Sequence, residues 1–182
     1  MALVGLPGAG KTVVAPLLAA LLGWRWDDLD AAIERAAGRS VPDLLRSDGE
    51  ARFRDRELDA LRAALAPRPE GLVLACGGGV VVGEEARGAI AAGATVAWLR
   101  VRPETALARL GGSGVASRPL LAGASTAGTA GALERLRELQ AAREPLYAAI
   151  AGISIATDER TPEGVAAALE AALRERWAGS AS

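Results

Sequence analysis

Short apolar runs alternate along the chain with longer segments in which apolar residues recur at helical spacing. The runs that read as strands are residues 2–4, a weaker 24–27, 72–75, 95–101 and 153–157. The segments that read as helices are approximately residues 11–22, 29–37, 41–45, 49–65, 83–91, 103–110, 133–147 and 162–177. Residues 47–50, Ser-Asp-Gly-Glu, fit a capping box at the start of the fourth helix. This alternation predicts an α/β fold, a three-layer domain with a central parallel sheet.

Length and composition fit one domain over residues 1–182, with 51% hydrophobic and 24% charged residues. The apolar runs are too short to span a bilayer and no basic leader precedes the first strand, so we expect a cytoplasmic protein without membrane association. Because that strand starts abruptly at Ala2, a few strand residues are expected to be missing upstream. The net charge of −1 provides no overall basic surface, so no nucleic-acid partner is expected.

The chain contains no histidine and one cysteine, Cys76. An internal disulfide, a cysteine metal cluster, histidine metal ligands and serine–histidine chemistry are therefore excluded. Catalysis would have to use carboxylates, arginines, backbone groups and a bound ion.

A phosphate-binding loop is the strongest chemical signal. Residues 5–12, Gly-Leu-Pro-Gly-Ala-Gly-Lys-Thr, fit G-x-x-x-x-G-K-[ST] between a predicted strand and a predicted helix. Such a loop turns backbone N–H groups toward phosphates at a helix start. Lys11, the only lysine of the chain, can then reach the outer phosphates, and the Thr12 hydroxyl can bind Mg²⁺. The alternative, a glycine-rich turn with an exposed lysine, fits this strand and helix context poorly.

Residues 111–132 interrupt the alternation and are rich in Gly, Ser, Thr and Ala. They could form a flexible linker, but too little chain follows them to make a second domain. We therefore predict a mobile lid over the nucleotide site. Arg118 in this segment would neutralise charge on the transferring phosphoryl group.

Two aspartates follow the predicted strand 24–27, at the edge of the sheet where open α/β folds bind ligands. Asp28 could lie near a metal ion and Asp30 near a substrate hydroxyl. Helix capping by Asp27 or Asp28 is the alternative for either residue taken alone. The presence of a phosphate loop favours the functional interpretation for the pair.

Three weaker patterns follow along the chain. Arg54 and Glu57 are three residues apart on a predicted helix and can pair, although an exposed ion pair is the more ordinary explanation of this spacing. Three glycines, residues 77–79, follow the strand 72–75 and permit either close approach of a ligand or a tight turn. Arg143 precedes Pro145 near a helix end and by itself indicates little.

Taken together and in this order, these motifs resemble the shikimate kinase family over nearly the whole chain. The matching motifs are the phosphate loop at 5–12, D-x-D at 28–30, D-G-E-x-x-F-R-x-x-E at 48–57, the triple glycine at 77–79, R-P-L-L at 118–121 and R-x-P-L-Y at 143–147. The resemblance implies a phosphate-loop kinase fold with strand order 2-3-1-4-5, substrate-binding helices at about 29–65, and a lid at about 111–132. It also implies ATP- and Mg²⁺-dependent phosphorylation of the shikimate 3-hydroxyl in aromatic amino-acid biosynthesis, by an enzyme that is expected to be a monomer.

The resemblance also assigns roles to individual residues. Asp30, Lys11 and Arg118 would be catalytic, with Asp30 as the base, and Thr12 and Asp28 would hold the metal ion, Asp28 through water. Shikimate would contact Asp30, Arg54, Gly78, Gly79 and Arg143. ATP would contact Gly8, Ala9, Gly10, Lys11, Thr12, Val13, Arg109, Arg118 and Arg160.

Other functions fit these residues less well. A small-molecule kinase such as gluconate kinase would share the phosphate loop but would not need paired arginines for a ring-borne carboxylate. A GTPase switch would want an N-K-x-D motif, and the chain contains no asparagine. A non-catalytic nucleotide-binding module would be expected to lose Asp30 or Arg118, and both are present.

Overall fold

The computed structural model describes residues 1–67, 69–116, 121 and 128–180. Its strands are β1 (Ala2–Val4), β2 (Arg25–Asp28), β3 (Leu72–Ala75), β4 (Val96–Arg100) and β5 (Ile153–Ala156). Its helices are α1 (Lys11–Leu22), α2 (Leu29–Ala37), α3 (Val41–Leu65), α4 (Glu84–Gly93), α5 (Pro103–Ala116), α7 (Gly128–Ile150) and α8 (Pro162–Ser180). Each predicted strand is present, shifted by no more than one residue at either end.

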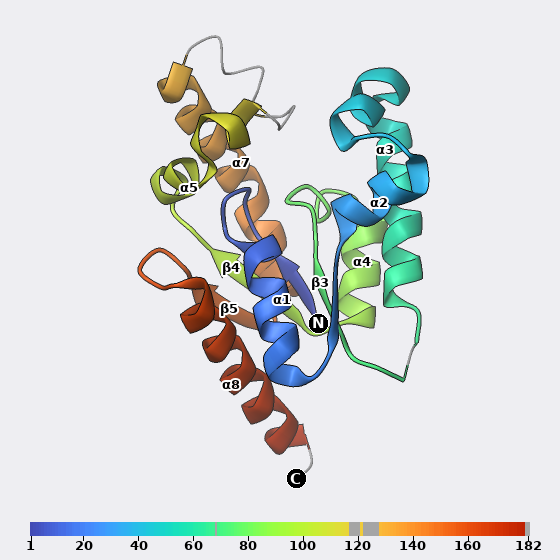
Figure 1. Cartoon of the computed structure of the whole chain (residues 1–182), viewed down its shortest axis with the longest axis vertical. Coiled ribbons are helices and arrows are strands. Elements are labelled where there is room, and N and C mark those ends of the chain that lie inside the picture. Colours follow the sequence, from blue (N-terminus) through green and yellow to red (C-terminus); the bar gives the residue numbers. More distant parts are fainter. Residues whose placement is uncertain (68, 117–120, 122–127, 181–182) are drawn as a thin grey trace.

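The strands form one parallel sheet in the order β2-β3-β1-β4-β5 (Figure 1). This confirms the expected order. Because all strands run the same way, the phosphate loop after β1, the start of α2 after β2 and the glycine turn after β3 meet at one edge of the sheet. The candidate chemistry is therefore gathered at the carboxyl edge.

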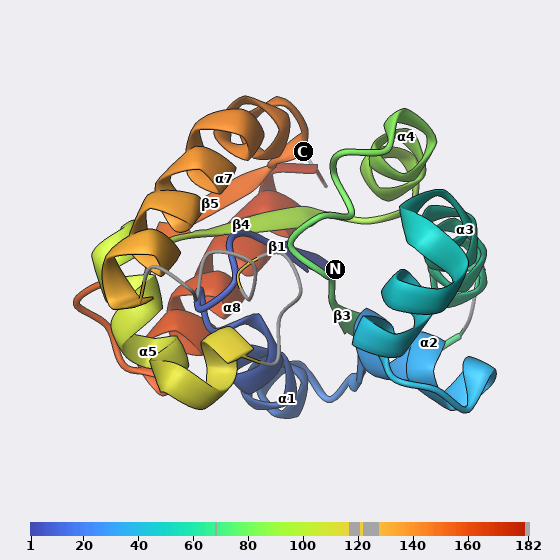
Figure 2. The same ribbon diagram turned by 90° about the horizontal axis from the view of Figure 1, so that it is seen from above.

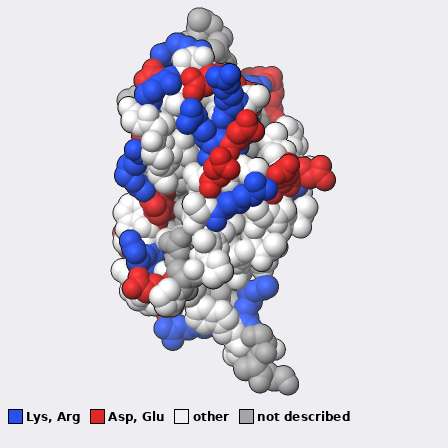
Figure 3. Space-filling model, turned by 90° about the vertical axis from the view of Figure 1, so that its right-hand side faces the viewer, with Lys and Arg blue, Asp and Glu red and all other residues white. Residues whose placement is uncertain are grey.

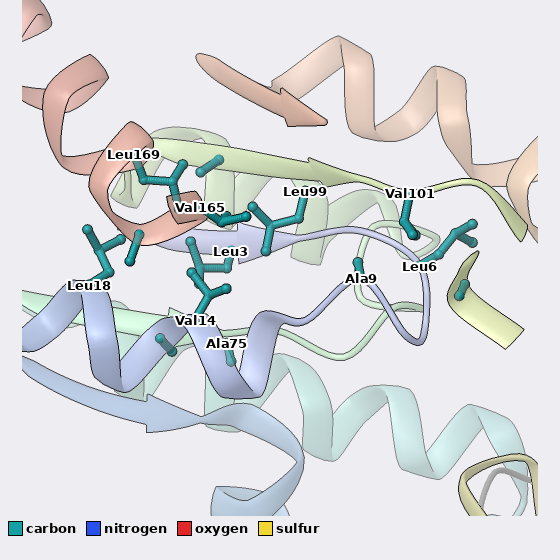
Figure 4. Packing of buried hydrophobic residues seen from close by; sticks show 14 of the residues in the cluster. Leu3, Leu6, Ala9, Val14, Leu18, Ala75, Leu99, Val101, Val165 and Leu169 are labelled. Atoms are coloured by element: carbon teal, nitrogen blue, oxygen red, sulfur yellow. The ribbon is translucent and has the colours of Figure 1, made fainter. Parts of the chain in front are cut away.

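Helices cover both faces of the sheet. In the view from above, α1 and α8 lie on one side, while α4 and α7 lie on the other, with α3 beside α4 (Figure 2). On the first side, buried side chains of the sheet interlock with those of α1 and α8; Figure 4 labels Leu3 and Leu99 of the sheet, Val14 and Leu18 of α1, and Val165 and Leu169 of α8. Burial of such aliphatic side chains fixes the loop after β1 on a rigid base.

Helix α3 consists of two helical parts that meet at a kink at Gly49, where φ is 83°. Two helices, 41–45 and 49–65, were expected, and the kink lies at the predicted start of the second. The predicted capping box does not form the start of the second part. The Ser47 hydroxyl lies instead 2.8 Å from the Asp43 carbonyl and 2.7 Å from the Asp48 carboxylate, and donates its one proton to these acceptors. The N-cap of α3 is Ser40, whose hydroxyl accepts from the Asp43 N–H.

The segment predicted as an irregular lid is helical at both ends. Helix α5 continues past the expected end at residue 110 to Ala116, with a break at Gly111, and α7 already begins at Gly128. Residues at both ends of the segment 111–132 therefore belong to neighbouring helices, and the lid itself stays a prediction. Leu121 is buried in the core cluster of α1, α5 and α7.

The surface over α2, α3 and α4 carries acidic and basic side chains side by side (Figure 3). Arg39 and Arg56 both contact Asp48, with N–O distances of 3.3 and 3.4 Å, and Arg62 lies 3.0 Å from Glu85.

Within the part of the chain that the structure describes, no helix is both long and apolar enough to cross a membrane.

Candidate active site

The phosphate loop connects β1 to α1 and wraps around the Lys11 ammonium group. Nζ of Lys11 donates to the carbonyl oxygens of Gly5 and Leu6, at 2.8 and 2.9 Å. At Gly8, φ is 81° and a side chain would come within 2.6 Å of the Ala106 carbonyl oxygen, so only glycine fits this turn. The loop therefore holds a cation at the N-terminal end of α1, where anions bind favourably.

Thr12 and Asp28 meet beside this loop. The Thr12 hydroxyl donates to Oδ2 of Asp28 at 2.7 Å. The other carboxylate oxygen, Oδ1, accepts from the backbone N–H groups of Asp30 and Ala31, at 3.0 and 3.3 Å. Asp28 is thus the N-cap of α2, as the alternative interpretation predicted, and it also contacts Thr12 beside the phosphate loop. One side chain has both contacts because Asp28 is the last residue of β2 and directly precedes α2.

Asp30 lies in the first turn of α2 and its carboxylate approaches the glycine turn. A side chain at Gly77 would come within 2.7 Å of Oδ1 of Asp30, so this turn lies directly against the carboxylate. Burial raises the pKa of Asp30 to about 6, and the neighbouring carboxylates of Asp28 and Glu57 act in the same direction. At neutral pH the group is an ionised carboxylate with a pKa near the working range of a general base.

Arg54 is held by two carboxylates of its own helix. Nη1 lies 2.6 Å from Oε2 of Glu57, and Nη2 lies 3.1 Å from Oε1 of Glu50. The pair with Glu57 is not an exposed ion pair, because Glu57 is only 2% exposed. Gly79 lies against the guanidinium, where a side chain would come within 2.8 Å of Nη2. The ion pair therefore fixes the direction of Arg54 toward the glycine turn.

Arg143 lies on α7 and is 6% exposed. Burial lowers its pKa, while the hydrogen bond from its guanidinium to Tyr147 acts in the opposite direction. The charge of Arg54 is close enough to lower the pKa of Arg143 further. The charges of both Arg54 and Arg143 act to lower the pKa of Glu57, against the larger effect of burial, so one buried carboxylate already lies close to both guanidinium groups. The planar N–H donors of two neighbouring guanidinium groups suit a bound carboxylate.

The other end of the site is formed by residues after β4 and β5. The guanidinium of Arg109 donates to both oxygens of Thr157: Nη1 lies 2.9 Å from Oγ1 and Nη2 lies 2.5 Å from the carbonyl oxygen. The Thr157 hydroxyl in turn donates to the Arg100 carbonyl at 3.0 Å. This network fixes Arg109 beside Leu110, Arg160 and Pro162, which line the same cavity.

A cavity of about 430 Å³ joins these groups. The predicted site residues that line it are Gly8, Ala9, Gly10, Lys11, Thr12, Val13, Asp28, Asp30, Gly78, Arg109 and Arg160. The cavity is not lined by Arg54, Gly79 or Arg143. Arg54 lies against Gly79, and Tyr147, one helical turn after Arg143, bonds to Gly78, so these residues adjoin the glycine turn at the cavity. The predicted catalytic residue Arg118 lies outside the described residues. The structure thus gathers the groups expected for ATP and those expected for shikimate at adjoining positions.

Sequence reasoning assigned no role to two residues that the structure places in this site. Tyr147 donates to the Gly78 carbonyl at 2.6 Å, and Thr157 holds Arg109. A signal for Tyr147 was available, because it follows Arg143 by four residues on one helix and so shares its face. Thr157 directly follows β5, at the sheet edge where the other site residues lie.

Comparisons with known proteins agree with this geometry. The family model for shikimate kinase matches residues 7–174. A shikimate kinase of Symbiobacterium thermophilum is 42% identical over 174 residues, which cover 96% of this chain and 95% of that protein. A shikimate kinase of Mycobacterium tuberculosis is 43% identical over 163 residues, which cover 90% of this chain and 86% of that protein. The solved structure of a shikimate kinase from Acinetobacter baumannii in complex with shikimate superimposes with a TM-score of 0.87 at 32% identity, covering 96% of this chain and 92% of that one.

Proposed function

The chain belongs to the shikimate kinase family, and we propose that it transfers the γ-phosphoryl group of ATP to the 3-hydroxyl of shikimate. The products are shikimate 3-phosphate and ADP, in the pathway to chorismate and the aromatic amino acids. The observation that carries the proposal is the cavity lined by the phosphate loop, Asp28 and Asp30. Two arginines lie close by, one half-buried (Arg54) and one buried (Arg143). A generic phosphate-loop fold requires only the first of these features.

Lys11 and the loop amides bind the phosphates of ATP. Two backbone carbonyls of the loop hold the ammonium group at the N-terminal end of α1, where the phosphates of ATP would bind. Phosphoryl transfer passes through a loose transition state with charge on the equatorial oxygens, and fixed donors that neutralise this charge lower the barrier. The amides of Gly8, Ala9, Gly10, Thr12 and Val13 complete the cradle.

The donor set beside the loop fits Mg²⁺. A hydroxyl and a carboxylate oxygen, those of Thr12 and Asp28, lie 2.7 Å apart, and both are hard oxygen donors of the kind that this ion prefers. Among the described residues, no three histidine, cysteine or acidic side chains gather into a metal cage. Magnesium typically keeps several waters and completes its shell with substrate phosphates, so one hydroxyl and one carboxylate suffice. When bound, the ion neutralises phosphate charge; Thr12 would bind it directly and Asp28 through water.

Asp30 orients the 3-hydroxyl of shikimate and accepts its proton. Its carboxylate lies between the phosphate loop and the glycine turn, in the cavity shared with Lys11. The pKa of about 6 keeps the carboxylate ionised at neutral pH and leaves it basic enough to take the proton late in the transfer. Positioning of the hydroxyl in line with the γ-phosphate supplies the larger part of the effect.

Arg54 and Arg143 bind the carboxylate of shikimate. The Glu57 side chain holds the first guanidinium and Tyr147 accepts a hydrogen bond from the second, so both are directed before the substrate arrives. Gly78 and Gly79 bring backbone groups close to the ring of shikimate. At the opposite end, Arg109 and Arg160 pack around the adenine, and Arg118 neutralises charge on the transferring group.

We expect the enzyme to act as a monomer in the cytoplasm. The residues assigned to both substrates come from one chain, so the site needs no group from a partner. Size-exclusion chromatography with light scattering at enzyme concentrations used in assays tests this directly, and a dimer that loses activity on dilution would contradict it.

The function is tested by measuring ADP release with shikimate, quinate, gluconate and nucleoside monophosphates offered separately. We expect strong stimulation by shikimate and little by gluconate or the nucleotides. If another acceptor stimulated release and shikimate did not, the substrate assignment would be wrong. If no acceptor did, the non-catalytic alternative would gain support.

A further inference from the structure

One hydroxyl group connects two of the elements that surround the candidate shikimate site. Tyr147 on α7 is 1% exposed, and its hydroxyl lies 2.6 Å from the carbonyl oxygen of Gly78, in the turn after β3. The same hydroxyl is hydrogen-bonded to the guanidinium of Arg143, one helical turn earlier. The Tyr147 ring stacks on Trp98 of β4, with ring centroids 5.9 Å apart.

The chemistry of the three groups fixes the direction of both hydrogen bonds. A guanidinium only donates and a carbonyl oxygen only accepts. The Tyr147 hydroxyl must therefore accept from Arg143 and donate its own proton to Gly78. Burial raises the pKa of Tyr147 to about 12, so the hydroxyl keeps that proton at neutral pH.

We propose that Tyr147 is a positioning residue that locks the Arg143 guanidinium to the Gly78 turn and so sets the geometry in which the shikimate carboxylate is bound. This inference rests on the proposed function. Arg143 lies on α7 and the glycine turn follows β3. These two elements must keep one relative position to bind a small rigid acid. The tyrosine ring is held by Trp98, so its hydroxyl can serve as the fixed point between them.

The substitution Tyr147→Phe isolates this role. Phenylalanine keeps the ring, its volume and its stacking on Trp98, and it removes only the hydroxyl. Arg143 then loses an acceptor in a buried position, and the Gly78 carbonyl loses a donor. We expect the KM for shikimate to rise about tenfold, the loss typical of a hydrogen bond to a charged group, while the KM for ATP changes less than about twofold.

A second readout separates positioning from general packing. The wild-type enzyme should prefer shikimate over its carboxamide analogue, because only the acid pairs with two cations. In Tyr147→Phe this preference should shrink by about tenfold, since the weakened contact is the one with the carboxylate. A purely structural defect would reduce the use of both acceptors equally.

Two variants serve as controls. Gly23→Ala places a side chain at φ 66° at the C-cap of α1, where nothing lies within 4 Å, so it lowers stability without touching the site. It should leave both KM values unchanged at temperatures below its unfolding transition. Thr157→Val removes a buried hydroxyl of the nucleotide end, and it should raise the KM for ATP rather than that for shikimate.

The outcomes distinguish this inference from the function on which it rests. A wild-type protein without shikimate-stimulated ADP release would contradict the proposed function itself. An active wild type together with an unchanged shikimate KM in Tyr147→Phe would overturn only the positioning role. Equal losses with acid and amide, or a matching rise in the KM for ATP, would overturn it as well.

Discussion

Replacing Asp30 with asparagine is expected to make the protein more stable and much less active at neutral pH. The carboxyl group has a pKa of about 6 in the folded state, against 3.8 for the free group, and burial is the main cause. The folded state thus favours the neutral form. The contribution of this group to the free energy of unfolding is therefore fully present below about pH 4, and it is lost as the pH rises through about 6. Asparagine has nearly the same size and never ionises, so the variant avoids this loss.

The size of the effect follows from the shift. The pKa rises by about two units, and each unit corresponds to about 1.36 kcal/mol, so ionised Asp30 lowers the free energy of unfolding by up to about 3 kcal/mol. A domain of this length changes its unfolding midpoint by about 2–4 °C per kcal/mol. Asp30→Asn should therefore melt as much as about 10 °C above the wild type at pH 8 and only slightly above it near pH 4.

Thermal unfolding of both proteins from pH 4 to pH 8, together with kcat at neutral pH, tests this reasoning. Asparagine cannot accept the proton, so kcat should fall by about 10² to 10⁴. Asp27→Asn is the matched control, since Asp27 forms an exposed ion pair with Arg35 and should give no pH-dependent gain. A stability difference that is the same at every pH, or a variant with wild-type kcat, would refute the assigned state of Asp30.

Four further substitutions test the other parts of the site. Lys11→Ala should lower turnover by about 10² or more, because it removes phosphate neutralisation in the transition state, and it should keep the unfolding midpoint. Near-normal turnover would mean that the loop does not hold the phosphates. Arg54→Ala and Arg143→Ala should weaken shikimate binding, measured calorimetrically, by about tenfold to a hundredfold and leave ATP binding intact. Loss of ATP affinity instead would place these arginines in the nucleotide site. Asp28→Asn should lower kcat and be partly rescued by raised Mg²⁺, whereas Asp30→Asn should not; the same response of both variants in a Mg²⁺ titration would contradict their separate roles.

The sheet and the phosphate end of the site could be predicted from the sequence because their signals are local. An apolar run, the glycines and Lys11 lie within a dozen residues, and a parallel sheet brings the ends of its strands to one edge. Asp28 shows the limit of such reasoning. Helix capping and a site role were weighed against each other as alternatives, yet the structure has one carboxylate oxygen at the helix start and the other on Thr12.

Other features depend on contacts between distant segments, which local patterns do not contain. Tyr147 and Gly78 are 69 residues apart, and Arg109 and Thr157 are 48 apart, so neither pair could be found from spacing alone. The predicted capping box at Ser47 was wrong. Ser47 belongs to the helical turn that precedes the kink at Gly49, and its hydroxyl bonds to the Asp43 carbonyl within that turn. The proposed role of Arg118 rests on its place in the segment 111–132 and on the family resemblance.

The central claim, phosphorylation of the 3-hydroxyl of shikimate by ATP, is tested most directly by the position of phosphate in the product. After incubation with shikimate, ATP and Mg²⁺, ³¹P–¹H correlation spectroscopy of the purified product should connect one phosphate to the proton on carbon 3, with one ADP formed for each product molecule. A phosphate on another hydroxyl, or ADP released without any phosphorylated shikimate, would contradict the account.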